Sequence, residues 1–286
     1  LSHEVLPQIK EFDRVSTTAV NAYVGPITVE YLTRLGERLT TSKDQPQVLI
    51  MQSNGGVASI DDSARQPVRS ILSGPAGGVS GALDYARAVG SDKAFGFDMG
   101  GTSTDVSLIE NGQPQLTTER SESGWTIAVP MIDISTLGAG GGSIARVDSG
   151  GILKVGPDSA GADPGPACYA AGGTQPTVTD ANLVLGYLSP ENFLGGKAAL
   201  KPTLAEKAIQ EHVGTPLSLS TTEAAYGVHQ VVSTAMAEGI RVLSARRGVD
   251  PRDFPIVAFG GAALAAPARP ARRPRAALPR ALEEGR

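Results

Sequence analysis

The fold is decided by the stretch Ala94-Phe-Gly-Phe-Asp98-Met-Gly100-Gly101-Thr102-Ser103-Thr104-Asp105-Val-Ser-Leu-Ile109, in which two apolar runs meet at a pair of glycines. Val106 and Leu108 alternate with polar neighbours, which is the period of a β-strand. A glycine pair supplies the positive φ of a tight turn. The stretch therefore predicts a β-hairpin.

The tip of this hairpin also has the composition of a phosphate-binding loop. Gly100 and Gly101 carry no side chains, so backbone N–H groups can approach a phosphate, and the run Thr102-Ser103-Thr104 adds hydroxyl groups. Asp98 can hold a hydrated Mg²⁺ ion, and Asp105 can orient that ion or a water molecule. An ordinary hairpin with a polar tip fits the same residues, so the local sequence leaves both interpretations open.

The composition limits the classes of protein to which the chain can belong. Its 286 residues include 35 glycines, one tryptophan and 41% hydrophobic residues, which is typical of a loop-rich α/β protein with one large or two small domains. The single cysteine, Cys168, excludes an internal disulfide framework and a cysteine-based zinc site, and it favours a reducing, cytoplasmic location. His3, His212 and His229 are far apart in the sequence and form no ligand pattern.

Charge and hydropathy argue against a nucleic-acid or membrane partner. The formal net charge is −4, but residues 262–286 carry six arginines and two glutamates, so residues 1–261 hold 19 basic and 27 acidic residues. That acidic body has no basic stretch suited to nucleic acid. No apolar run is long enough to cross a bilayer, and the first residues do not have the pattern of a signal peptide.

Two motifs ahead of the hairpin join apolar runs to glycine-rich loops. Residues 48–51 are predicted to be a buried strand that ends in Gln52-Ser-Asn54-Gly55-Gly56, where α/β proteins place ligands, although a plain βα turn fits as well. Ser73-Gly-Pro-Ala-Gly77-Gly78 opens a helix that continues to about Val89. Its glycines leave N–H groups free to face an anion.

Two further loops follow the hairpin. A strand predicted over residues 126–134 leads into Leu137-Gly-Ala-Gly140-Gly141-Gly142-Ser143, whose glycines imply close backbone approach to a ligand or to another segment. Residues 156–176 have neither helical nor strand period, and a loop of that length is usually functional or covers a site. Residues 176–180 predict a short strand that ends in Asp180, which caps the next helix or takes part in the chemistry.

The remaining elements follow from capping residues and apolar periodicity. Helices are predicted over residues 16–39, capped by Ser16, Thr17 or Thr18, over residues 181–188 and 203–212, and from Thr221 or Thr222 onward. A last strand enters the turn Gly260-Gly261. The buried face of the last helix is predicted to be Ala225, Val228, Val232, Ala235, Met236, Ile240 and Leu243.

Seven motifs of the chain resemble those of the hydantoinase A/5-oxoprolinase family and stand in the family's order. The resemblance runs from about Ser2 to Ala262. The motifs are Gln52-Ser-Asn-Gly-Gly56, Ser73-Gly-Pro-Ala-Gly-Gly78, Phe97-Asp-Met-Gly-Gly-Thr-Ser-Thr-Asp105, Leu137-Gly-Ala-Gly-Gly-Gly-Ser-Ile-Ala145, Ala160-Gly-Ala-Asp-Pro-Gly-Pro-Ala-Cys-Tyr169, Pro176-Thr-Val-Thr-Asp-Ala-Asn182 and Phe259-Gly-Gly261.

The resemblance implies an α/β fold of the actin-like ATPase type, related to the Hsp70 chaperones and the sugar kinases, with ATP and Mg²⁺ as cofactors. It implies a reaction in which the amide oxygen of a hydantoin or of 5-oxoproline, a compound of glutathione metabolism, is phosphorylated so that water opens the ring. Asp98, Asp105 and Asp180 are then expected to serve catalysis, with Asp98 at the metal. The residues expected to bind the nucleotide are Asn54, Gly55, Gly77, Gly100, Gly101, Thr102, Ser103, Thr104, Gly140, Gly141, Gly142, Gly260 and Gly261.

Departures from the family pattern leave other functions open. The family's first phosphate loop lies in an N-terminal domain that this sequence lacks, Ala170-Ala171 replaces the usual Gly-Arg, and the usual residues after Gly261 are replaced. We therefore expect an incomplete core domain over residues 1–261. The chain is then part of an ATP-dependent cyclic amidohydrolase, the nucleotide-binding subunit of an acetone-type ketone carboxylase, or a non-catalytic truncated remnant. The expected partners are a small cyclic amide and a hydantoinase B-type subunit.

Residues 262–286 are expected to be an aberrant Ala/Pro/Arg-rich tail. From Ala262 to Leu282 every residue is Ala, Arg, Pro or Leu, which suits GC-rich codons read out of frame. A Pro/Ala-rich linker or basic arm is the alternative. Four prolines break any helix across the segment, so we expect an exposed, protease-sensitive tail.

Overall fold

The computed structural model describes residues 1–40, 47–122, 124–196 and 198–263, so all but the first two residues of the tail predicted over residues 262–286 lie outside the described residues. The chain divides into two compact units, each described by itself below. The first unit comprises Leu1–Asp92 and Ser107–Ile134, and the second comprises Lys93–Val106 and the chain from Ser135 onward. Among the helices that the structure describes, none has the length and apolar character needed to span a bilayer.

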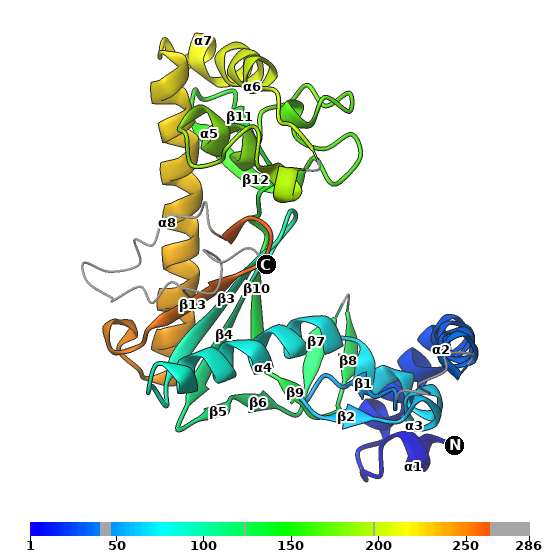
Figure 1. Cartoon of the computed structure of the whole chain (residues 1–286). Coiled ribbons are helices and arrows are strands. Elements are labelled where there is room, and N and C mark those ends of the chain that lie inside the picture. The colour runs from blue at the N-terminus through cyan, green and yellow to red at the C-terminus, as the bar shows by residue number, and fades with distance from the viewer. Residues whose placement is uncertain (41–46, 123, 197, 264–286) are drawn as a thin grey trace. The chain divides into compact units, whose positions relative to one another are not determined.

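Helices and short antiparallel pairs of strands make up the first unit (Figure 1). Its small core contains Val5, Val68, Ile127, Val129 and Met131. Its elements are α1 (Ser2–Val5), α2 (Glu11–Thr40), β1 (Ile50–Met51), β2 (Val57–Ala58), α3 (Ile60–Arg65), the 3-10 turn η1 (Pro67–Ser70), α4 (Ser73–Ala88), β5 (Gln113–Pro114), β6 (Leu116–Thr117), β7 (Arg120–Glu122), β8 (Trp125–Ile127) and β9 (Met131–Ile132).

The long helix α2 begins earlier than its predicted caps. It starts at Glu11, and Pro26 lies inside it without ending it. Ser16 and Thr17 are buried, and their hydroxyl groups bond outside the helix instead of capping it. The Ser16 hydroxyl donates to the Thr126 carbonyl at 2.8 Å, and the Thr17 hydroxyl accepts from the N–H of residue 128 at 3.0 Å. These bonds attach the helix to the segment that contains β8.

Two predicted strands of the first unit are shorter than expected. The strand predicted over residues 126–134 is interrupted between β8 and β9, where Pro130 lacks the N–H group that a continuous ladder requires. The strand predicted over residues 48–51 is reduced to β1, which pairs with β2 in a hairpin around Gln52–Gly56 rather than entering a helix. The helix predicted from Ser73 is confirmed as α4.

The central sheet has the strand order β10-β4-β3-β13, formed by β10 (Ile134–Leu137), β4 (Thr104–Glu110), β3 (Ala94–Met99) and β13 (Ile256–Phe259). β13 runs parallel to β3, and Phe259 pairs with Asp98. β4 continues into the first unit, where the turn Asn111-Gly112 reverses the chain into β5 with positive φ at both residues. The predicted strands on both sides of Gly100-Gly101 are therefore confirmed.

One detail of the prediction for that hairpin, the positive φ of its glycines, was wrong. Neither Gly100 nor Gly101 has a positive φ, and the turn is closed by the Gly100 N–H donating to the Ser103 carbonyl at 3.0 Å. The glycines are thus not required by the turn itself. A Cβ atom at Gly101 would meet nothing within 4 Å and one at Gly100 would make only an ordinary contact at 3.7 Å, so the packing of the free protein does not require these glycines either.

The rest of the second unit packs around the long helix α8 (Thr221–Arg247), which Figure 1 shows in orange. α8 begins at Thr221, one of the two predicted starts, with Ser220 as its cap, and it ends at Gly248 in the left-handed conformation. Of its predicted buried face only Ala235 is exposed, and the buried residues also include Ala224, His229, Ala237 and Ser244. The other elements are β11 (Ser143–Val147), β12 (Leu153–Ser159), η2 (Ala167–Tyr169), α5 (Val178–Val184), η3 (Phe193–Gly196), α6 (Pro202–Ile209), η4 (Gln210–Gly214), α7 (Thr215–Leu217) and η5 (Pro251–Asp253).

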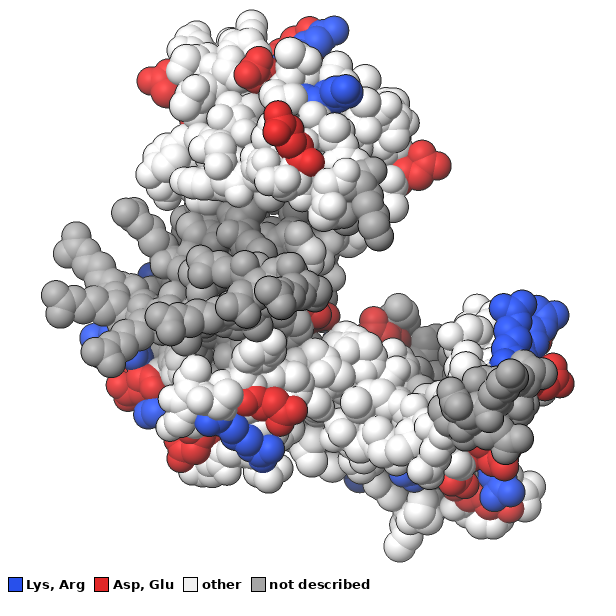
Figure 2. All heavy atoms as spheres, viewed as in Figure 1, with Lys and Arg blue, Asp and Glu red and all other residues white. Residues whose placement is uncertain are grey.

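Charged side chains of both signs are interspersed on the face of the molecule shown in Figure 2. The excess of acidic residues in the segment 1–261 therefore does not form a single acidic patch on that face. Most ion pairs on the surface are short-range pairs along helices, such as Arg34 with Glu30 and Arg241 with Glu238. Exposed pairs of this kind contribute about 0–1 kcal/mol each, so they do not decide the fold.

Candidate functional site

Two glycine loops of the second unit are joined backbone to backbone. The Gly141 N–H donates to the Gly100 carbonyl at 3.0 Å, and the Gly142 N–H donates to the Gly101 carbonyl at 2.6 Å. A Cβ atom added at Gly140 would lie 2.7 Å from the Gly101 oxygen, a distance that real contacts do not reach. The close approach predicted for the loop at 140–142 is therefore an approach to another segment of the chain.

The start of α5 and the turn after β13 join the same assembly. The Gly141 carbonyl accepts from the Thr179 N–H at 2.7 Å and from the Thr179 hydroxyl at 2.8 Å. The N–H of Ala262 donates to the Met99 carbonyl at 2.9 Å. Segments that are far apart in the sequence thus hold one another in place around the tip of the hairpin.

Two carboxylates lie at the base of this tip. Asp98 lies one residue before the end of β3 and beside Gly260, where its Oδ1 occupies the position that a Cβ of residue 260 would need. Burial, and then the negative charge of Asp105, raise the pKa of Asp98. Asp105 is itself oriented by Thr136, whose hydroxyl donates to Oδ1 at 2.7 Å. A divalent cation at this position would neutralise the repulsion between the two carboxylates.

The residues present fit Mg²⁺ rather than an ion that is fully enclosed by protein ligands. The described residues contain no group of three or more His, Cys, Asp or Glu side chains that could hold a metal ion. Mg²⁺ in nucleotide sites is usually held by one or two carboxylates, with water and phosphate oxygens as the other ligands. Asp98 and Asp105 supply such a pair.

The three hydroxyl residues of the tip differ in their surroundings. The Thr104 side chain is fully buried, and its hydroxyl donates to the Ala139 carbonyl at 2.6 Å. Thr102 is exposed and Ser103 is half-buried. Thr104 therefore connects the hairpin to the 139–142 loop, whereas Thr102 and Ser103 are the hydroxyl groups that a ligand can reach.

A cavity of about 230 Å³ lies beside the joined loops. Bare backbone at Gly101, Gly141 and Gly261 forms part of its lining, together with the side chains of Tyr169 and Phe193. The two aromatic rings have centroids 5.3 Å apart. Because glycines admit phosphate oxygens and aromatic rings favour flat apolar groups, the cavity suits a flat ring that carries a polyphosphate.

Sequence reasoning did not identify the aromatic part of this cavity. Tyr169 belongs to the irregular segment 156–176, which also contributes Gly161 and Pro166 to the lining. The absence of regular period in that segment was the available signal. Phe193 lies in η3, and nothing in its local sequence distinguishes it from a core residue.

Asp180 is placed inside the protein, where it supports the loop at Ala167 and Cys168. It is fully buried, and its Oδ1 accepts from the Cys168 N–H at 2.8 Å. Its Oδ2 accepts from the N–H of Ala167 at 3.2 Å and from the N–H and hydroxyl of Thr177 at 2.9 and 2.8 Å. Two predictions for this segment were wrong. Residues 178–180 begin the helix α5 instead of ending a strand, and Thr177 is the N-cap of α5, whereas Asp180 is the third helical residue of a capping box.

The predicted site residues Asn54, Gly55 and Gly77 lie in the first unit. Gly55 has a φ of +83°, which an L-residue adopts with strain, and the Asn54 Oδ1 accepts from the Gly56 N–H at 2.9 Å. A Cβ at Gly77, in α4, would meet only ordinary contacts. That these residues join the loops of the second unit in one nucleotide site stays a prediction.

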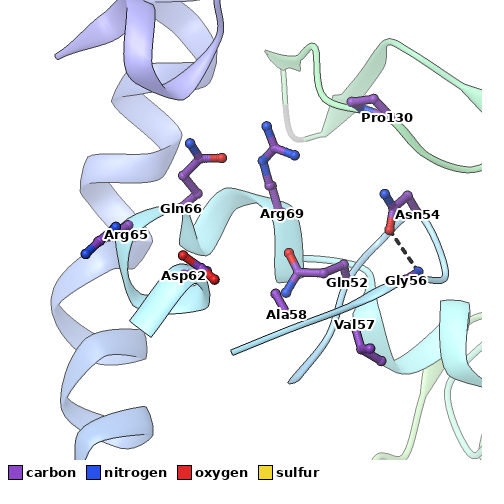
Figure 3. Close-up of a pocket in the computed structure, with 10 residues that line it drawn as sticks. All are labelled: Gln52, Asn54, Gly56, Val57, Ala58, Asp62, Arg65, Gln66, Arg69 and Pro130. Carbon is purple, nitrogen blue, oxygen red and sulfur yellow. Dashed lines mark hydrogen bonds between the residues drawn. The ribbon is translucent and has the colours of Figure 1, made fainter. Parts of the chain in front are cut away.

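A larger cavity of about 440 Å³ lies in the first unit (Figure 3). Asn54 and Gly56 line it from the turn between β1 and β2. Arg65 and Arg69 line it from the end of α3 and from η1. Neither arginine belongs to a motif that sequence reasoning singled out, because isolated arginines in a polar segment follow no pattern.

Comparison with known proteins identifies relatives of this chain. The family model described as hydantoinase/oxoprolinase matches residues 14–270. The caprolactamase subunit alpha of Pseudomonas jessenii is 45% identical over 91% of this chain and 38% of its own length, and the 5-oxoprolinase of Saccharomyces cerevisiae is 38% identical over 92% and 21%. The nucleotide-free structure of acetone carboxylase superposes with a TM-score of 0.80 at 31% identity, covering 93% of this chain and 37% of the other.

The chain thus spans about two fifths or less of the length of each of these relatives. The glycine motifs, the central sheet and the solved structure agree on an α/β fold of the actin-like ATPase type, as the sequence predicts. On the family model and on these relatives, the chain belongs to the hydantoinase/oxoprolinase family.

Proposed function

We propose that the second unit binds ATP with Mg²⁺, and that the whole protein uses ATP to open a cyclic amide. The carboxylate pair Asp98 and Asp105 beside the joined glycine loops is the observation that supports this most directly. The names of two relatives, caprolactamase and 5-oxoprolinase, are those of enzymes that act on cyclic amides. Because the chain corresponds to 38% of the caprolactamase subunit, the activity, the substrate and a hydantoinase B-type partner are proposed for the whole protein.

Each residue of the tip has a separate role in this proposal. Asp98 and Asp105 hold the cation, and the backbone of Gly101–Ser103 with the Thr102 hydroxyl contacts the phosphates, since the N–H groups of Gly141 and Gly142 already donate to carbonyls. Gly261, Tyr169 and Phe193 line the cavity that receives the base. When bound, ATP would supply a phosphoryl group to the amide oxygen, which makes the amide carbon more electrophilic, so that water can add to this carbon and the ring C–N bond can break, with phosphate released when the acyl phosphate is hydrolysed. Positioning and neutralisation of charge suffice for such a transfer, so no nucleophilic side chain is required.

A second function is supported by the match to acetone carboxylase. That structure superposes on this chain with a TM-score of 0.80, and its protein carries out ATP-dependent acetone carboxylation. In this case the same loops bind ATP. The substrate that is phosphorylated is then the ketone or the compound that supplies its new carboxyl group. A non-catalytic remnant is the third interpretation, and it predicts that the chain does not bind Mg·ATP.

Calorimetric titration with Mg·ATP tests the proposal. Asp98→Ala should weaken binding by more than Thr102→Ala, because a carboxylate at the metal makes charge-assisted contacts whereas one hydroxyl contributes about 0.5–1.5 kcal/mol. The control is Asp158→Ala, which removes an exposed carboxylate paired with Arg146. Undiminished affinity in the Asp98 variant would refute the assignment of the phosphate loop. Turnover of caprolactam, 5-oxoproline or acetone by the whole protein then distinguishes the two enzymatic functions.

A further inference from the structure

The cavity of the first unit is built around one arginine. In Figure 3 the side chain of Arg69 extends from η1 into the pocket, and Asn54 lies on the turn that faces it. The pocket, with a volume of about 440 Å³, is large enough for a small organic molecule. It belongs entirely to the first unit and does not include the glycine loops of the second unit at residues 100–103, 140–142 and 260–261, although its residue Asn54 was also predicted to contact the nucleotide.

The backbone on both sides of Arg69 is fixed by hydrogen bonds. The Arg69 carbonyl accepts from the Ser53 N–H at 2.7 Å, and the Ser53 hydroxyl accepts from the Leu72 N–H at 3.0 Å. The Val68 N–H donates to the Oδ1 of Asn21 at 3.1 Å. The guanidinium group is therefore presented from a rigid turn.

That guanidinium group has an unsatisfied donor. The Nε of Arg69 is buried, and it has no hydrogen-bond partner within the described part of the chain. The other arginine with such an atom, Arg14, differs because its Nη1 donates to the Gln8 carbonyl at 2.8 Å and because it does not line this pocket. Leaving a buried donor unpaired is unfavourable. An oxyanion that bonds to Nε and to a neighbouring Nη of Arg69 removes this cost, since the two N–H groups match two oxygens of a carboxylate or phosphate.

The neighbours of Arg69 favour the same kind of ligand. Because the Asn54 Oδ1 accepts from the Gly56 N–H, the amide is oriented and its NH₂ group is left to donate. Arg65 adds a second positive charge to the lining, and no ion pair or hydrogen bond of its side chain occurs among the described residues. The one acidic residue in the lining is Asp62, whose Oδ2 accepts from the Ser59 hydroxyl at 2.7 Å. The lining is thus net positive.

From these contacts we infer that the pocket of the first unit binds the oxyanion group of a small molecule, with Arg69 as its bidentate partner. The anion is a carboxylate or a phosphate. If the anion is a carboxylate, the pocket would distinguish an acidic cyclic amide from an uncharged one, and this consequence rests on the proposed function. The binding of the anion does not rest on the proposed function, because it requires neither ATP nor turnover.

Titration of the full chain by calorimetry, without nucleotide, tests this inference. The probes are inorganic phosphate, 5-oxoproline, which has a carboxylate, and 2-pyrrolidone, which has the same ring without one. We expect one of the two anions to bind and 2-pyrrolidone not to. Which anion binds identifies the source of the oxyanion.

Variants distinguish a specific contact between Arg69 and the anion from a general attraction of the anion to positive charge. Arg69→Gln should weaken anion binding at least tenfold and Arg69→Lys by less, whereas Arg34→Gln, at an exposed arginine paired with Glu30, should not change it. Asn54→Asp keeps the acceptor for Gly56 but adds a negative charge, so it should also weaken binding in a chain that folds normally. Failure of both anions to bind, or equal affinities in the parent chain and Arg69→Gln, would overturn the inference. Because Asp98→Ala and Mg·ATP are absent from this experiment, its failure would not affect the proposed ATP site.

Discussion

Removing the Asp180 carboxylate should release the segment that contains Cys168. Asp180→Ala deletes four hydrogen bonds and leaves the N–H groups of Ala167, Cys168 and Thr177 unpaired in residues that are at most 2% exposed. Each unpaired buried donor costs about 1–3 kcal/mol, and neighbouring atoms relax, so we expect a total loss of about 3–5 kcal/mol. Asp180→Asn keeps one oxygen acceptor and should cost about 1–2 kcal/mol.

The assay is the rate at which a thiol reagent labels Cys168. This cysteine is the single one in the sequence and is fully buried, so its labelling reports opening of the segment. A loss of about 3 kcal/mol in local stability should accelerate labelling about 100-fold. Burial, and then the charge of Asp180, raise the pKa of the Cys168 thiol, so removing that charge also accelerates labelling. Because both variants remove the charge, the ratio of the Ala rate to the Asn rate measures the hydrogen bonds alone.

Asp158→Ala is the matched control for this experiment. Asp158 is an exposed carboxylate that pairs with Arg146 at 3.1 Å, and its loss should cost at most about 1 kcal/mol and leave the labelling rate unchanged. Equal labelling rates in Asp180→Ala and Asp180→Asn would refute the argument that Asp180 holds the loop through its hydrogen bonds.

Three more predictions concern stability. Gly140→Ala should lower the free energy of unfolding in urea by about 1–3 kcal/mol, because its Cβ would lie 2.7 Å from the Gly101 carbonyl oxygen. Gly101→Ala should cost far less, because its Cβ meets nothing within 4 Å. Similar losses in the two variants would contradict the packing argument. Burial and a neighbouring carboxylate raise the pKa of Asp98, so the folded protein loses stability as pH rises through that pKa. Asp98→Asn should therefore raise the melting temperature at about pH 7, and this gain should disappear towards about pH 4. Burial lowers the pKa of His229, whose Nδ1 lies 3.1 Å from the Asn182 Oδ1. As pH falls, the unfolded chain therefore takes up a proton first, and the stability of the folded protein should decrease below about pH 6.5. If the stability of a His229→Gln variant depends on pH in the same way as that of the parent, this histidine is excluded as the cause.

Elements whose signals are local could be predicted from the sequence. The strands around Gly100 and Gly101 and the start of α8 at Thr221 depend on residues within a few positions of one another. Turn residues, caps and short apolar periods determine such elements whatever the rest of the chain does. Ser220 and Gly248, at the two ends of α8, are examples.

Errors arose where a residue serves a contact made far away in the sequence. Ser16 and Thr17 resemble helix caps, but both are used for bonds to residues 126 and 128. Gly140 was predicted to allow close approach to a ligand or to another segment, and the segment that it approaches is the distant hairpin tip at Gly101. In both cases the residue type was informative, and the partner that explains it could not be known before the fold.

The candidate sites show the same division. Asp98 and Asp105 could be proposed from the sequence because both belong to one short motif, and their proximity follows from the hairpin. Arg69, Tyr169 and Phe193 were missed because they line cavities that form only when separate segments pack together. A cavity has no sequence signature of its own.

The parallel pairing of β13 with β3 has a consequence for how the protein folds. Ile256 pairs with Phe95, so the central sheet gains its last strand only after the intervening chain has been synthesised. Until then β3 has one unpaired edge, and Asp98 lacks the neighbour Gly260. Pairing over such a separation is slow because the long loop must close first, and an open strand edge invites pairing with other chains. Aggregation during expression should therefore depend on how fast residues 256–259 reach the sheet, and chains interrupted before them should be the most prone to it.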